Sequence, residues 1–272
     1  MAEFFAGVRP GRAGLALFLN AGDPPLDALT DVVRALDECG VDCLELAVPF
    51  PDSVTDGPVI RRSADRALAN GTGLDDVLAF TTALRPELRH LRIALLADWS
   101  YTVRPLRHED FVRRVAESGV DGLLVHGLPP RLRDEHLRTA AAAALPIVTT
   151  CYATSDRVVR ASAAEHVSAY LYMVAARGRS GSRPVDGYTG LSPVLAELRL
   201  TTTAPIAVGF GVRSARDVTA LTAAGADAAV VGSAAVEVVE ATLDTRGDIA
   251  GELTEFVQGL HGTEEKSLEG LS

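Results

Sequence analysis

The chain is poor in cysteine and lysine, and it has no long apolar run. Its three cysteines, Cys39, Cys43 and Cys151, are too few for a disulfide framework, so we expect a reducing compartment. The single lysine, Lys266 near the C-terminus, disfavours Schiff-base chemistry, which needs an amine in the active site. No apolar stretch approaches the ~20 residues of a membrane helix, and the N-terminal residues lack the pattern of a secretory signal. We therefore expect a cytoplasmic protein outside the membrane.

Acidic residues outnumber basic ones, and the formal net charge is −10. This charge disfavours nucleic acid or an anionic membrane as the main partner. A phosphorylated small molecule stays open, because backbone amides and helix N-termini bind phosphate without basic side chains. The six histidines have no partner at the spacing of a metal site. We therefore assign no metal and no cofactor.

Short apolar runs rich in β-branched residues alternate with longer amphipathic stretches, which is typical of βαβ units. An open doubly wound sheet is the alternative, but it usually has fewer strands and a glycine-rich turn, and no G-x-G-x-x-G follows the first run. The pattern predicts a single-domain (β/α)8 TIM barrel over residues 1–261, with a polar tail over residues 262–272. The eight expected strands are Gly14–Ala21, Cys43–Val48, Leu91–Ala97, Gly122–His126, Pro146–Thr150, Ala169–Val174, Pro205–Gly209 and Ala228–Val231.

The helical patterns between the strands include one long stretch, Ala234–Leu260, near the end of the chain. We expect Asp23, before two prolines, to cap the first helix, since aspartate is favoured at that position. The other expected helices are Leu26–Cys39, Val59–Ala69, Leu74–Leu84, Glu109–Ser118, Ser155–Glu165 and Ser214–Ala224.

Glycines follow the last two strands in a pattern that suits phosphate. The seventh strand ends in Gly209 and is followed by Gly211, and the eighth is followed by Gly232 and Ser233 at a helix start. Adjacent loops of a barrel can place free amides and a helix dipole on one anion. The glycines could instead serve only tight strand-to-helix turns, but two such turns on consecutive strands favour a phosphate site. Gly181, after the sixth strand, could complete it.

Acidic residues provide candidates for proton transfer. Glu45 lies within an apolar strand, where a carboxylate is costly unless it is paired or protonated, and a raised pKa suits a general acid/base. A structural ion pair with a neighbouring strand is the alternative. Asp56, in the next loop, is a second candidate, although aspartate there could simply cap a helix or form a turn. Asp98 and His126 end the third and fourth strands and could face the same pocket.

The segment Leu44–Ile60, LELAVPFPDSVTDGPVI, resembles the signature of the tryptophan synthase alpha subunit family, L-E-L-G-x-P-F-S-D-P-x-A-D-G-P-x-I. The resemblance extends over nearly the whole chain. It implies a carbon–carbon lyase of tryptophan biosynthesis that cleaves indole-3-glycerol phosphate to indole and glyceraldehyde 3-phosphate, and it implies a pyridoxal-phosphate beta subunit as partner.

The resemblance also implies a role for each matched residue. Glu45 would protonate the indole carbon that carries the side chain, and Asp56 would accept the indole N–H and stabilise the positive charge. Tyr172 would lie near the glycerol portion. Further residues would bind the substrate: Phe18 and Leu96 at the indole ring, and Gly181, Gly211, Gly232 and Ser233 at the phosphate.

Several loops depart from the family pattern. S-D-P reads Pro51–Ser53, M-Y-x-N reads Ala97–Ser100, and A-D-V-P reads His126–Pro129. These departures favour weaker coupling to a beta subunit. They also leave alternatives open: a free-standing paralogue of specialised metabolism, another phosphorylated substrate in a pocket remodelled by Asp98, Trp99 and His126, or a non-catalytic allosteric partner of a beta subunit.

Overall fold

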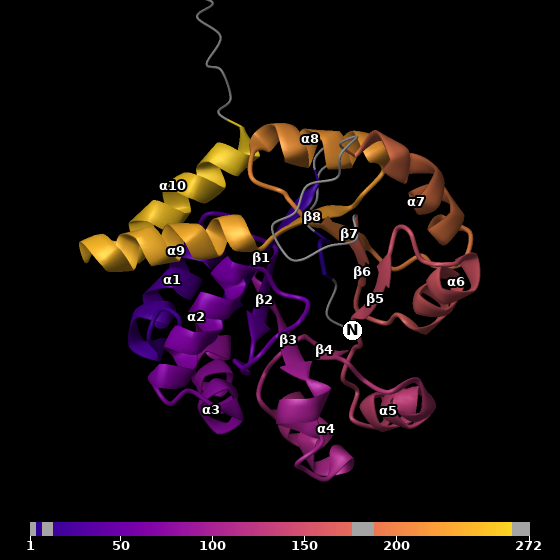
Figure 1. Ribbon diagram of the computed structural model, residues 1–272, viewed down its shortest axis with the longest axis horizontal. Coiled ribbons are helices and arrows are strands. Elements are labelled where there is room, and N and C mark those ends of the chain that lie inside the picture. Colours follow the sequence, from indigo (N-terminus) through magenta and orange to yellow (C-terminus); the bar gives the residue numbers. More distant parts are fainter. Residues whose placement is uncertain (1–3, 7–12, 176–187, 263–272) are drawn as a thin grey trace, which may run out of the picture.

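The structure is a computed structural model, and it describes residues 4–6, 13–175 and 188–262. Gly181 and the expected tail beyond Gly262 lie outside these residues. Eight parallel strands form one sheet in the order β4-β3-β2-β1-β8-β7-β6-β5, and helices surround it (Figure 1). The strands are β1 Gly14–Asn20, β2 Cys43–Ala47, β3 Arg92–Asp98, β4 Gly122–His126, β5 Thr149–Tyr152, β6 Leu171–Val174, β7 Ile206–Gly209 and β8 Ala228–Val231.

The sheet closes between its two edge strands, β4 and β5, through an isolated parallel bridge that joins Leu123 to Ile147. The Leu123 amide donates to the Pro146 carbonyl at 2.9 Å, and the Val148 amide donates to the Leu123 carbonyl at 2.9 Å. The predicted (β/α)8 barrel is confirmed. The fifth strand differs from its expected range, because the continuous ladder to β6 starts only at Thr149.

The helices form a ring outside the strands (Figure 1). Their apolar faces pack on the strands, as expected for an all-parallel sheet covered by helices. They are α1 Leu26–Glu38, α2 Pro58–Ala69, α3 Leu74–Leu84, α4 His108–Glu117, α5 Arg133–Ala142, α6 Arg157–His166, α7 Ser192–Arg199, α8 Ala215–Ala224, α9 Ser233–Thr245 and α10 Ile249–His261.

The long helix expected over Ala234–Leu260 is wrong, because this stretch forms two helices. Arg246 ends α9 in the left-handed conformation, with φ 54°. Gly247 follows, and the Asp248 carboxylate then accepts a hydrogen bond of 3.1 Å from the Gly251 amide and starts α10. The turn lets α10 pack back against α1 and α9.

Asp23 does not cap α1, contrary to expectation. The helix starts after Pro25 without a side-chain cap. The buried Asp23 carboxylate instead accepts two hydrogen bonds of 2.8 Å from the Arg66 guanidinium on α2. Arg66 also donates to Glu240 on α9 at 2.7 Å, so one side chain connects the loop after β1 to two helices. Two buried lone pairs of a carboxylate are better satisfied by this bidentate pair than by one amide.

Side chains fill the half of the barrel at the amino ends of the strands and close that end. Phe4 and Phe5 are buried against Tyr170, with ring centroids 5.1 and 5.5 Å apart, respectively. The strand positions around these rings are mostly small: Ala16, Cys43, Ala94, Gly122, Ala207 and Ala228. The next inward-facing residue on each strand lies two positions further along. These residues, one layer higher, form the floor of a pocket.

Candidate active site

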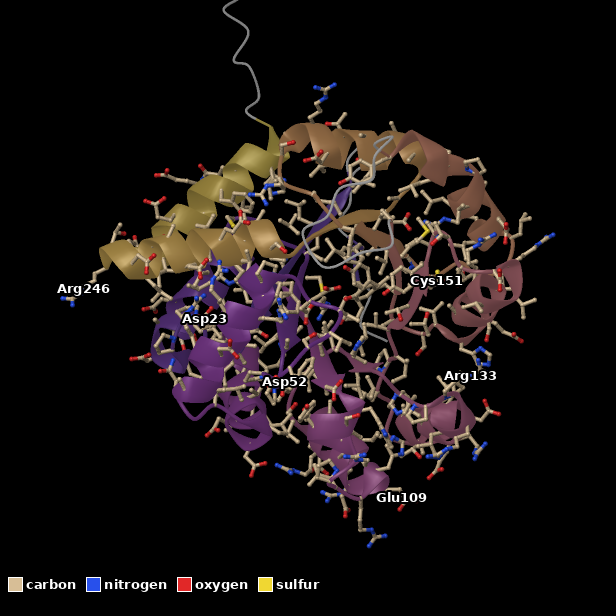
Figure 2. All side chains as sticks on the ribbon, viewed as in Figure 1. Asp23, Asp52, Glu109, Arg133, Cys151 and Arg246 are labelled. Carbon is tan, nitrogen blue, oxygen red and sulfur yellow. The ribbon has the colours of Figure 1, made fainter. Side chains whose placement is uncertain are left out.

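A cavity of about 410 Å³ opens at the carboxyl ends of the strands, where the active sites of such barrels lie. Its floor consists of the layer of side chains above the Phe4, Phe5 and Tyr170 rings. This layer includes Phe18, Glu45, Leu96, Leu124 and Tyr172. The loops after β2, β7 and β8 form parts of its rim. In Figure 2, Asp52 and Cys151 lie inside the helix ring, whereas Glu109, Arg133 and Arg246 lie at its outer side.

Glu45 is 1% exposed and faces the cavity from the middle of β2. The Tyr170 hydroxyl donates a hydrogen bond of 2.6 Å to its Oε1 atom. Burial raises the pKa of Glu45 to about 7, and the Tyr170 hydrogen bond opposes this shift only in part. A carboxyl group with this pKa is present in both protonation states near neutral pH, so it can give a proton and take one back.

Asp56 lies at the rim of the same cavity, in the loop after β2. It does not cap α2, because the N-cap position is Gly57 and Pro58 is the first helical residue. The Ser53 hydroxyl donates a hydrogen bond of 2.6 Å to Asp56 Oδ2, and the Asp56 amide points back to the Ser53 oxygen at 3.3 Å. Ser53 is itself 8% exposed. The Ser53 contact therefore orients one oxygen of Asp56 and leaves the carboxylate at the cavity.

Tyr172 reaches the cavity from β6, two residues beyond Tyr170. Burial and the nearby Glu45 charge raise its pKa, so its phenol stays protonated at neutral pH. Gly209 is absent from the residues that line the cavity. A Cβ atom at Gly209 would lie 2.6 Å from the Tyr172 ring. The absence of a side chain at Gly209 thus leaves room for the Tyr172 ring.

The loops after β7 and β8, where the sequence predicts a phosphate site, line one end of the cavity. Gly211 has φ 76°, and Gly232 is the N-cap of α9. The Ala235 amide already donates to the Gly232 carbonyl at 3.0 Å, so the amides that precede it at the helix start, those of Ser233 and Ala234, are the donors that a helix leaves without an internal acceptor. The Ser233 hydroxyl is buried and has no hydrogen-bond partner among the described residues. Arg213, also at the cavity, is paired with Glu237. Backbone amides and one hydroxyl are thus the groups available to an anion.

Comparison with known proteins agrees with this geometry. The family model described as tryptophan synthase alpha chain matches residues 5–264. A tryptophan synthase alpha chain from Acaryochloris marina is 36% identical over 240 residues, covering 87% of this chain and 88% of the relative.

The chain belongs to the tryptophan synthase alpha chain family.

Other members agree over greater lengths. The alpha chain from Burkholderia thailandensis is 35% identical over 259 residues, covering 94% of this chain and 93% of the relative. Mycobacterium tuberculosis tryptophan synthase superimposes with a TM-score of 0.82 at 26% identity, covering 95% of both chains. A Pyrococcus furiosus structure described as a tryptophan synthase a2b2 complex gives a TM-score of 0.81 at 25% identity, covering 94% of this chain and 99% of the other.

The family assignment makes this protein a carbon–carbon lyase of tryptophan biosynthesis. It cleaves indole-3-glycerol phosphate to indole and glyceraldehyde 3-phosphate. In the described part of the chain, no helix is long and apolar enough to cross a membrane. Among the same residues, no three His, Cys, Asp or Glu side chains gather closely enough to hold a metal ion.

Of the three residues expected to remodel the alpha-chain pocket, only His126 lines it. Asp98 is buried, and its Oδ1 atom accepts hydrogen bonds from the amides of Ser100 at 2.8 Å and Tyr101 at 2.9 Å. It thereby caps the π-helical turn Trp99–Val103. Trp99 packs edge-on against His108, with centroids 6.2 Å apart.

Two residues that sequence reasoning missed belong to this site. Ser53 stands three residues before Asp56, a spacing that favours a hydroxyl–carboxylate contact within one turn, so the sequence held a local signal. Tyr170 lies 125 residues from Glu45, and nothing in the local pattern indicates that contact.

Proposed function

We propose that Glu45 and Asp56 carry out the cleavage of indole-3-glycerol phosphate as a pair. The protonated Glu45 gives its proton to the indole carbon that bears the glycerol side chain. Asp56 accepts a hydrogen bond from the indole N–H and balances the positive charge that protonation creates. Support comes from the buried carboxyl group of Glu45 on the pocket floor, whose pKa is raised to about 7.

The bond between the ring carbon and the glycerol then breaks, and its electrons return to the indole ring. The hydroxyl on the departing carbon becomes the aldehyde of glyceraldehyde 3-phosphate and loses its proton. Glu45, now ionised, takes this proton and is restored for the next cycle. Tyr170 is a positioning residue, because its hydrogen bond fixes one oxygen of Glu45 and leaves the other for transfer.

The substrate phosphate is assigned to the loops after β7 and β8. The helix dipole of α9 and its free amides favour an anion, and the orphaned Ser233 hydroxyl gains a partner when phosphate binds. Gly211 and Gly232 allow the close backbone approach, and Gly181 is expected to assist. Phe18 and Leu96, on the pocket floor, would pack on the indole ring.

The test measures indole release from indole-3-glycerol phosphate. Glu45→Gln and Asp56→Asn should each lower kcat by at least ~100-fold, since general acid–base groups contribute 10²–10⁴. Glu109→Gln, at an exposed position of α4, is the matched control and should leave kcat unchanged. If either active-site variant keeps the turnover of the parent protein, its assigned role is wrong.

A beta subunit of tryptophan synthase is the partner we propose. Exposed apolar side chains surround the mouth of the pocket: Val54, 81% exposed, after β2, Tyr101 and Leu106 after β3, and Val158, 80% exposed, in the first turn of α6. Exposed apolar groups gathered around one opening are typical of a protein-binding face. The a2b2 assembly of the Pyrococcus furiosus relative supports the same partner.

This partner is tested by co-expression with a tryptophan synthase beta chain. Val54→Asp and Val158→Asp should abolish co-purification and any stimulation of cleavage. Leu200→Asp is the matched control, because Leu200 is 84% exposed but follows α7, at the opposite end of the barrel. A free-standing lyase would give full activity alone and no co-purification in any variant.

The three unpaired cysteines support a cytoplasmic location.

A further inference from the structure

The wall of the pocket that faces the phosphate site carries polar side chains above its apolar floor. In the ring of eight strands, β4 lies four strands away from β8, and β3 lies four strands away from β7. A substrate held by its phosphate at β7 and β8 therefore extends across the mouth toward β3, β4 and β5. Its indole ring, beyond the reacting carbon at Glu45, lies against that wall. This placement depends on the function proposed above.

His126 stands on this wall. Leu124 of the same strand belongs to the buried cluster inside the barrel, and alternation along β4 gives His126 the same inward side. Its side chain lines the cavity, and no hydrogen bond or ion pair involves it among the described residues.

Thr150 supplies a second polar group beside it. The bridge between Leu123 and Ile147 sets the pairing of β4 with the β5 segment, and His126 and Thr150 each lie three residues beyond it. Thr150 lines the cavity and is exposed, whereas its neighbour Thr149 turns the other way and donates to the Ala163 carbonyl at 2.8 Å. An imidazole and a hydroxyl thus line the cavity from neighbouring strands, at the same distance along the chain from the bridge.

An unsubstituted benzo ring offers these two groups only C–H edges. Its approach removes water from the imidazole and the hydroxyl without returning a hydrogen bond, which weakens binding. A substituent that donates or accepts a hydrogen bond restores the lost contact. We propose that His126 and Thr150 form a specificity subsite, and that the enzyme prefers indole-3-glycerol phosphates carrying a hydroxyl or amino group on the benzo ring.

The experiment uses the reverse condensation of indoles with glyceraldehyde 3-phosphate. Each benzo position is tested with a matched pair, the hydroxyindole and the methylindole, which differ little in size but strongly in hydrogen bonding. At one position, kcat/KM for the hydroxyindole should exceed that for the methylindole by about tenfold or more. His126→Ala should bring this ratio close to one, and the isosteric Thr150→Val should lower it.

His90→Ala is the control, because His90 is exposed before β3, at the amino ends of the strands, and should keep the parent ratio. A ratio near one at all four positions in the parent protein overturns the proposal and makes His126 a solvated residue of the rim. If no indole is condensed at all, the lyase mechanism fails instead. In that case, calorimetry measures the affinity of the protein for each hydroxyindole and its matched methylindole. The ratio of these two affinities then tests the subsite independently of turnover.

Discussion

Glu45→Gln should raise the stability of this enzyme while it abolishes cleavage. Burial raises the pKa of Glu45 from an ordinary 4.5 to about 7. The folded protein therefore holds a proton that the unfolded chain has released at intermediate pH. The free energy of unfolding must then fall as pH rises from about 4.5 through about 7. At ~1.4 kcal/mol for each pKa unit, the full cost above pH 7 is ~3 kcal/mol.

Glutamine has the same shape, keeps an oxygen for the Tyr170 hydroxyl and carries no charge. The gain in stability of Glu45→Gln over the parent should be close to zero near pH 4.5 and approach ~3 kcal/mol at pH 8. Urea unfolding at four or five pH values measures it. Tyr170→Phe provides a second check, because losing the hydrogen bond that favours the ionised form should raise the Glu45 pKa further.

Two results would refute this reasoning. A stability difference that stays constant from pH 5 to pH 8 would mean that the carboxyl group does not titrate in this range. A Glu45→Gln protein less stable than the parent at pH 8 would mean that the ionised carboxylate is stabilised in the folded state. The kinetic counterpart is a cleavage rate that declines as pH rises past about 7, since the acid is the protonated form.

Three further substitutions test the surrounding positions. Ser53→Ala removes the 2.6 Å hydrogen bond to Asp56 and should lower kcat about tenfold with little change in KM, as steady-state kinetics will show. Gly209→Ala places a Cβ atom 2.6 Å from the Tyr172 ring and should cost ~1–3 kcal/mol in denaturant unfolding. Ser233→Ala should raise KM several-fold and leave the unfolding midpoint unchanged, because its hydroxyl has no described protein partner.

Periodicity predicted the architecture well because strand and helix patterns are local. Two of the strand ranges, Gly122–His126 and Ala228–Val231, match the observed bounds, and five others, such as the one around Glu45, differ by one or two residues at their ends. The break between α9 and α10 was missed because it depends on the left-handed backbone of Arg246, and arginine is not a residue type that indicates this conformation. The shift of β5 was missed because its pairing with β6 depends on tertiary register, not on composition.

The candidate site was predictable where an ionisable residue stood within an apolar segment of the sequence. Glu45 is such a residue, because it lies inside an apolar strand, and the structure places it at the pocket. Asp98 carried a similar signal but caps a π-helical turn, because an aspartate at a strand end satisfies either role. The Glu45 contact with Tyr170 depends on how β2 and β6 face each other across the barrel, and no single segment of sequence encodes that distance.

The single bridge between Leu123 and Ile147 makes the resistance of the barrel to local opening uneven. Other neighbouring strands share ladders of three or more residue pairs, such as β1 with β2, whereas this seam has one. The amides of Leu123 and Val148 should thus exchange with solvent through smaller fluctuations than amides on β1. His126 and Thr150 lie just beyond this seam. The wall that meets the substrate ring therefore lies where the barrel can open with the smallest loss of backbone hydrogen bonds.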